Sequence, residues 1–117
     1  MLRTNKKTIN IASSATYSEW FEVPNWSTFC MVYIPDIDSG NVGLELTIDG
    51  GTTYAPILKA DGTADLVIAA SGTDPCIVDI SDYLRSVVDY DTHSVQLRFT
   101  CAAQNSGAVN CIAYFKE

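Results

Sequence analysis

Hydrophobic and polar positions alternate with a period of two in several stretches of the chain, which is the pattern of a β-strand with one buried face. The clearest stretch is residues 42–48, and its apolar members are Val42, Leu44, Leu46 and Ile48. An Asp-Gly-Gly turn signal at residues 49–51 follows, and the chain can return as a second strand over residues 53–58. Residues 42–58 therefore predict a β-hairpin, in which Pro56 places the second strand at an edge because it lacks a backbone donor.

A second hairpin is predicted at the end of the chain, where residues 95–101 and 109–116 flank a polar turn. With the turn centred on Ser106, the facing pairs are Cys101 with Cys111, Phe99 with Ala113, Leu97 with Phe115 and Arg98 with Tyr114. This register predicts that the thiols of Cys101 and Cys111 are close enough to oxidise and that the other two cysteines are unpaired. The two hairpins predict one core that contains Leu44, Leu46, Ile48, Leu97, Phe99 and Phe115.

Shorter strand signals fill most of the remaining chain, at residues 9–12, 18–23, 28–34, 66–70 and 76–80. One short helical turn is predicted within residues 81–88, with Ser81 as its cap. Eight or nine short strands without a βαβ alternation predict an all-β fold, an antiparallel β-sandwich that is jelly-roll-like or immunoglobulin-like. Residues 29–34 are apolar at both parities, so we expect the core to cover one face of that strand and a loop, another subunit or a partner to cover the other.

Composition agrees with one folded domain, since the chain has 117 residues of which 47% are hydrophobic. Its 14 acidic and seven basic side chains give a net charge of −7, which argues against a nucleic-acid partner. Residues 1–7 hold Arg3, Lys6 and Lys7 and no acid, whereas residues 8–117 hold the other four basic and all 14 acidic side chains, a charge of −10. We therefore expect a basic N-terminal arm at residues 1–7, either frayed or docked on a partner, and a β-sandwich over residues 8–117. No signal peptide or transmembrane segment is apparent.

Candidate chemistry is sparse. Residues 47–54 resemble an Asp box, a hairpin motif of sialidase-like propellers and of some virus proteins, and this resemblance implies a structural role for Asp49. Asp36 and Asp38 have the opening spacing of some calcium loops without the later ligands, so they predict a polar turn, as do residues 61–65. The lone His93 has no nucleophile elbow to serve, and the four cysteines show no C-x-x-C pair. We expect no enzyme, no metal and no cofactor.

Aromatic side chains offer a binding hypothesis. The candidates for a platform on which sugar rings could stack are Trp20, Phe21, Trp26, Tyr33 and Tyr54. The alternation within residues 19–22 would, however, bury one aromatic ring in the core. A core or subunit-interface role for these rings is therefore weighed against the sugar platform.

Taken across most of its length, the sequence resembles the small β-sandwich virion proteins of tailed bacteriophages. The segments that carry the resemblance are residues 26–29 leading into 32–35, the hairpin at 48–54, residues 79–84, and residues 95–100 with the Ala/Asn/Ser/Gly-rich turn after them. The resemblance implies a structural protein of the virion, made in the host cytoplasm. The role that it implies first is a capsid decoration or cement protein, and the next is a tail or collar component.

Two hypotheses follow from the sequence. In the first, the protein binds the major capsid protein and sister copies as a homo-oligomer, without nucleic acid or membrane. In the second, it is a carbohydrate-binding module that uses exposed aromatic residues. The residues expected to contact a partner are Arg3, Lys6, Lys7, Trp20, Trp26 and Tyr33.

Overall fold

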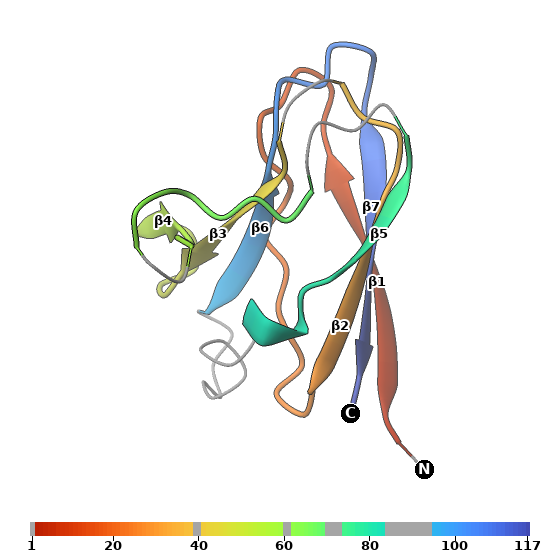
Figure 1. The fold of residues 1–117 in the computed structure, drawn as a ribbon, viewed down its shortest axis with the longest axis vertical. Coiled ribbons are helices and arrows are strands. Elements are labelled where there is room, and N and C mark those ends of the chain that lie inside the picture. The colour runs from red at the N-terminus through yellow and green to blue at the C-terminus, as the bar shows by residue number, and fades with distance from the viewer. Residues whose placement is uncertain (1, 39–40, 60–61, 70–73, 84–94) are drawn as a thin grey trace.

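The fold is a sandwich of two antiparallel sheets, seen edge-on in Figure 1, in a computed structural model that describes residues 2–38, 41–59, 62–69, 74–83 and 95–117. One sheet has four strands in the order β1-β7-β2-β5, and the other has three in the order β4-β3-β6. The strands are β1 (Thr4–Ile11), β2 (Phe29–Ile34), β3 (Gly43–Thr47), β4 (Tyr54–Pro56), β5 (Cys76–Asp79), β6 (Gln96–Thr100) and β7 (Val109–Lys116). A 3-10 turn, η1 (Ser81–Tyr83), lies at the start of the predicted helical region, whose remaining residues lie outside the described part of the chain. The predicted all-β sandwich is confirmed.

Two segments that were predicted as full strands pair only through isolated bridges. Tyr17 bridges Thr100 and Phe21 bridges Leu97, so residues 17–21 run along the free edge of β6. Val42 bridges Ala69, which places residues 66–69 of the predicted strand at 66–70 beside the start of β3. Within the described residues no helix is long and apolar enough to span a membrane.

The first predicted hairpin is confirmed. β3 and β4 pair antiparallel, with Thr47 opposite Tyr54 and Glu45 opposite Pro56. β4 is an edge strand of its sheet, as Pro56 predicted. Gly50 and Gly51 both have positive φ, at 77° and 109°, which is the backbone that a tight turn needs and that glycine adopts without strain.

The second predicted hairpin is wrong. β6 pairs with β3, whereas β7 lies between β1 and β2 in the opposite sheet. Residues 101–108 carry the chain across the sandwich, and the buried Gln104 fixes this crossing by donating from Nε2 to the carbonyl of Ala102 and accepting the N–H of Asp38. The alternation identified the buried faces of both strands, but two strands facing one core from opposite sheets have the same alternation as a hairpin.

The cysteine prediction therefore loses its basis. Cys101 and Cys111 are not cross-strand neighbours in one sheet, and all four cysteines are free thiols. Burial raises the pKa of Cys30 and of Cys111 to about 12, with smaller contributions from Asp79 to the first and from the nearby thiols of Cys101 and Cys76 to the second. Such thiols carry little thiolate at neutral pH and act as small apolar side chains.

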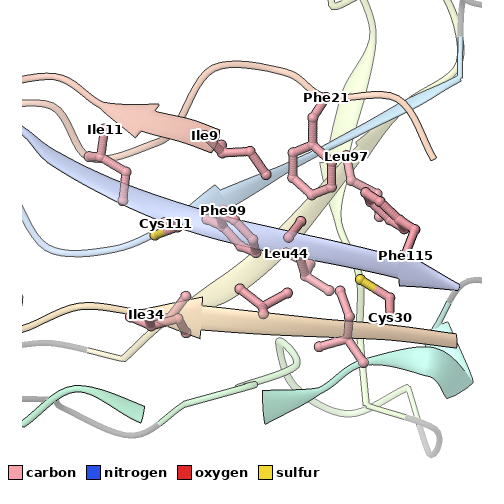
Figure 2. Close-up of a cluster of buried hydrophobic side chains, with 14 of the residues drawn as sticks. Ile9, Ile11, Phe21, Cys30, Ile34, Leu44, Leu97, Phe99, Cys111 and Phe115 are labelled. Carbon is pink, nitrogen blue, oxygen red and sulfur yellow. The ribbon is translucent and has the colours of Figure 1, made fainter. Parts of the chain in front are cut away.

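The core lies between the two sheets (Figure 2). Of the predicted members, Leu44, Leu97, Phe99 and Phe115 are fully buried and Leu46 packs at its margin. Ile48 was predicted wrongly, since it is 61% exposed. β3 ends at Thr47, so the alternation stops there and the isoleucine points out of the turn.

The expected basic arm is part of the sheet. Residues 4–7 form the first half of β1, and Lys6 and Lys7 lie opposite Tyr114 and Ala113 of β7. β1 is an edge strand, where polar and charged side chains are tolerated and discourage pairing with other chains. Residues 1–7 therefore have the composition expected of a free terminus, although residues 4–7 belong to an edge strand.

Candidate docking surfaces

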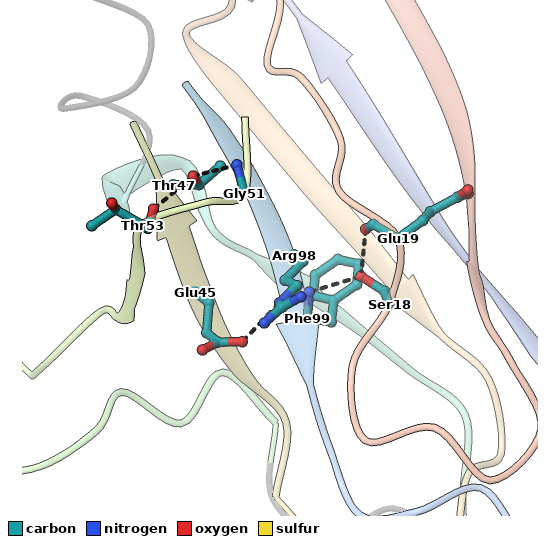
Figure 3. Close-up of polar contacts among 8 residues, drawn as sticks. All are labelled: Ser18, Glu19, Glu45, Thr47, Gly51, Thr53, Arg98 and Phe99. Carbon is teal, nitrogen blue, oxygen red and sulfur yellow. Dashed lines mark hydrogen bonds and ion pairs between the residues drawn. The ribbon is translucent and has the colours of Figure 1, made fainter. Parts of the chain in front are cut away.

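The hairpin between β3 and β4 is held by side chains that close its turn (Figure 3). Thr47 Oγ1 is fully buried, donates to the carbonyl of Thr53 at 2.7 Å and accepts the N–H of Gly51 at 2.7 Å. Asp49 Oδ1 accepts the N–H of Thr53 at 2.7 Å, and this bond, followed by that of the Thr53 hydroxyl, lowers the pKa of the carboxyl. The Asp-box-like segment thus has the structural role that the resemblance implied, and it fixes the position of Tyr54.

Arg98 occupies the solvent side of the three-stranded sheet, yet its side chain is almost completely covered. Its Nε donates to Glu45 Oε1 at 2.8 Å, and the residue is only 7% exposed. Its guanidinium lies 4.2, 4.3 and 4.5 Å from the ring centroids of Tyr17, Trp20 and Tyr54. We call these five residues the Arg98 cluster. The sequence register had placed Arg98 beside Tyr114, which is wrong because β6 and β7 belong to different sheets.

The cluster leaves aromatic surface open to solvent. Tyr17 and Tyr54 are 50% and 51% exposed, and Trp20 meets Tyr54 edge-on with centroids 5.9 Å apart. Beside Trp20 a shallow groove of about 480 Å³ is lined by, among others, Lys7, Glu19, Glu22 and Gln96. This side of the molecule therefore combines ring surfaces with carboxylate, ammonium and amide groups.

The four-stranded sheet presents a different surface. Its solvent side carries two complete rows of side chains across the strands, which we call the outer face. The rows, from β1 to β5, are Lys6, Tyr114, Met31, Asp79 and Thr8, Ile112, Tyr33, Ile77. Ile77 is 66% exposed and Tyr33 is 37% exposed, while Met31, Ile112 and Tyr114 are half-buried by their neighbours. The apolar second face predicted for residues 29–34 is thus continuous with apolar residues on both flanking strands.

The six residues predicted to contact a partner do not form one site. Lys6 and Tyr33 lie on the outer face, and Trp20 lies in the Arg98 cluster on the opposite sheet. Arg3 forms an ion pair with Glu117 and stacks on Trp26, 5.3 Å from the ring centroid. Lys7 donates to the carbonyl of Glu22 at 2.6 Å, and partial burial lowers its pKa. Arg3, Lys7 and Trp26 are therefore engaged within the chain.

The proposed sugar platform is also divided. Phe21 is buried and packs on Phe99 with centroids 5.2 Å apart, which confirms that residues 19–22 bury one aromatic ring. Trp20 and Tyr54 come together, whereas Tyr33 lies on the other sheet. Tyr17 joins the first two rings and was missed, because the pairing of its segment with β6, which the local sequence does not show, brings it there.

An aspartate of one predicted polar turn, Asp38, holds two loops together by hydrogen bonds. Asp38 accepts the N–H and hydroxyl of Ser106 at 2.9 and 2.7 Å, so it links the loop after β2 to the crossing between β6 and β7. The hydroxyl and then the N–H of Ser106 lower the pKa of this carboxyl. In the part of the chain that the structure describes, no group of His, Cys, Asp and Glu side chains is arranged to hold a metal ion. His93, Asp61 and most of the segment 81–88 lie outside the described residues.

Comparison of this chain with protein-family models, with curated proteins and with solved structures finds no match.

Proposed function

We propose that the protein is a non-enzymatic structural protein of a virion, a capsid decoration or cement protein that binds the major capsid protein and sister copies. The observation that carries the proposal is the outer face, where Tyr33 and Ile77 lie side by side on neighbouring strands and are open to solvent. Exposed apolar side chains gathered on one sheet face are the usual mark of a protein contact. The virion as the setting rests on the sequence resemblance alone.

Contact between sister copies on a repeating shell suits such a surface. A single small sheet face supplies modest binding energy, but many copies on one lattice bind with the avidity of the whole array. The carboxylate of the Asp-box-like hairpin is used within its own turn, which agrees with a structural role for Asp49.

Purified particles of the phage that encodes the chain provide the test. We expect the protein in density-banded virions, and we expect recombinant protein to load onto capsids that lack it. Tyr33→Glu should weaken loading because it places a charge at the centre of the contact between copies, whereas Ile48→Glu, at an exposed isoleucine remote from the outer face, should load as the native protein does. Absence of the protein from banded virions would contradict the proposal.

A second candidate, a carbohydrate-binding module, is favoured by the Arg98 cluster and the groove beside Trp20. Sugar rings stack on aromatic faces while carboxylate and amide groups bind their hydroxyls. Calorimetric titration with a panel of bacterial surface glycans tests it. Binding that Tyr17→Ala removes and Tyr33→Ala leaves unchanged would support this function, and an absence of binding across the panel would contradict it.

A further inference from the structure

The outer face has opposite charges at its two edges. In the first of the two rows that cross all four strands, Lys6 lies on β1, Tyr114 and Met31 lie on the central strands, and Asp79 lies on β5. The neighbouring row begins with Thr8 and ends with Ile77. Across these two rows the face is therefore cationic at one edge, apolar in the middle and anionic at the other edge, while the exposed Lys116 lies on the same side at the end of β7.

This order is self-complementary. A two-fold axis that runs parallel to the strands, above the line between β7 and β2, places β1 of one copy over β5 of the other and β7 over β2. Lys6 of each copy then faces Asp79 of the other, in two equivalent pairs. In the centre Tyr114 faces Met31, and in the next row Ile112 faces Tyr33.

We infer that the outer face packs against the same face of a second copy about this axis, so that the protein forms a two-fold symmetric dimer. The inference deepens the proposed function and rests on it, since it identifies a sister copy as the occupant of the outer face. The capsid would then meet the dimer through other surfaces, one of which is the Arg98 cluster.

The charges select this axis over the other two-fold arrangement in the plane of the contact. An axis perpendicular to the strands would place β1 over β1 and β5 over β5, and like charges would then meet at both edges. Only the parallel axis brings each ammonium to a carboxylate. Lys6 is available for this role, because no ion pair or hydrogen bond of its ammonium occurs among the described residues, whereas Arg3 and Lys7 are engaged.

The distances across such a contact are compatible with the pairs. Packed sheets lie about 10 Å apart, a gap that a lysine side chain and an aspartate together can span. Asp79 Oδ1 already accepts the N–H and hydroxyl of Ser81, which holds the carboxylate at the end of β5. The central apolar side chains exclude water from the middle of the contact, and the ion pairs at its rim fix the orientation.

Sedimentation equilibrium of the purified full chain over a concentration series tests the inference. We expect the native protein to dimerise and Tyr33→Glu to raise the dimer Kd more than about 100-fold, because Tyr33 faces Ile112 of the other copy and the change buries a charge in the centre of the contact. Ile48→Glu is the control, the same charge placed at an exposed apolar residue outside the outer face, and it should leave the Kd unchanged. A native protein that stays monomeric at every concentration would overturn the inference.

Charge reversal tests the axis itself. Lys6→Glu should raise the dimer Kd about tenfold, and Lys59→Glu, the same change at an exposed lysine after β4, should not. Asp79→Lys also removes the Ser81 contact, so its dimer Kd is compared with that of Lys6→Glu/Asp79→Lys, which suffers the same local loss. Recovery in the double variant supports the parallel axis, and an equally weak double variant overturns it.

The two proposals fail separately. A monomeric protein that still loads onto capsids would refute the dimer and leave the virion function standing. A dimer with the predicted charge dependence, from a protein absent from virions, would refute the virion function and leave the dimer standing.

Discussion

The solvent sides of the two sheets differ in whether other segments of the chain cover them. On the three-stranded sheet, residues 17–20 and the hairpin at Tyr54 fold over Arg98, so the chain supplies its own cover. On the four-stranded sheet, Tyr33 and Ile77 remain open. Both sheets are parts of one small sandwich, and the difference teaches that a polar residue can mark a covered face and an apolar residue an open one.

Substitution of Arg98 should cause the largest loss in the free energy of unfolding. Arg98→Ala leaves the carboxylate of Glu45, whose side chain is only 14% exposed, without its partner and removes the cation from three rings. We expect a loss of about 3 kcal/mol in the free energy of unfolding, measured by urea denaturation. Arg3→Ala is the control, since Arg3 also has an ion pair and a ring contact but is exposed. Equal losses in the two variants would show that covering Arg98 with the three rings adds nothing to the free energy of unfolding.

Thr47 should come next. Thr47→Val keeps the shape of the side chain but leaves the N–H of Gly51 and the carbonyl of Thr53 without their hydroxyl partner. We expect unfolding to be easier by about 2 kcal/mol. Thr52→Val, at an exposed threonine of the same turn, should be close to neutral. If both variants unfold alike, the hydroxyl does not hold the hairpin that carries Tyr54.

Acid should weaken both sheets together. The carboxyls of Asp38, Asp49 and Asp79 have a pKa below the ordinary 3.8, chiefly through hydrogen bonds from Ser106, Thr53 and Ser81 respectively. Because each pKa is lower in the folded state, the stability that each contributes is complete above the ordinary pKa and is lost as pH falls through the lowered value.

The urea midpoint should therefore hold steady down to about pH 5 and then decline, as the carboxyls begin to protonate. Replacing the three aspartates with asparagine should flatten the decline. A midpoint that rises on acidification between about pH 5 and pH 3 would contradict the assignment.

The smallest effect on stability is expected at the open face. Ile77→Ser should change the free energy of unfolding by no more than about 0.5 kcal/mol when measured at a concentration where the protein is monomeric, because Ile77 is largely exposed. The same substitution should weaken self-association. A loss as large as that of Arg98→Ala would mean that Ile77 has cover within the chain, and the contrast between the two faces would disappear.

Local signals in the sequence predicted local structure well. The hairpin of β3 and β4 was predictable because its turn residues, its alternation and its edge proline lie within 17 consecutive residues. The apolar second face of β2 was predictable for the same reason. β7 carries the same signal, with Ile112 and Tyr114 alternating with buried residues, so its share of the outer face could have been found.

Strand partners could not be predicted in this way. Alternation states which side chains face the core but leaves open which strand lies alongside, so β6 and β7 looked like a hairpin although they belong to different sheets. The Arg98 cluster was hidden for a related reason, since it requires residues 17–20 to lie beside β6. Lys6 and Lys7 looked like a free arm because a polar edge strand and a frayed terminus share one composition.

The position of β7 has a consequence for the order in which the molecule can be made. β7 lies between β1 and β2, although it follows all the other described strands in the sequence. Until residue 116 has been synthesised, the strand that lies between β1 and β2 is missing, so these two strands cannot be joined in one sheet. The strands β3, β4 and β6 can already pair with one another. Completion of the sandwich must therefore follow synthesis of its final strand, and the nascent chain carries unpaired strand edges until then.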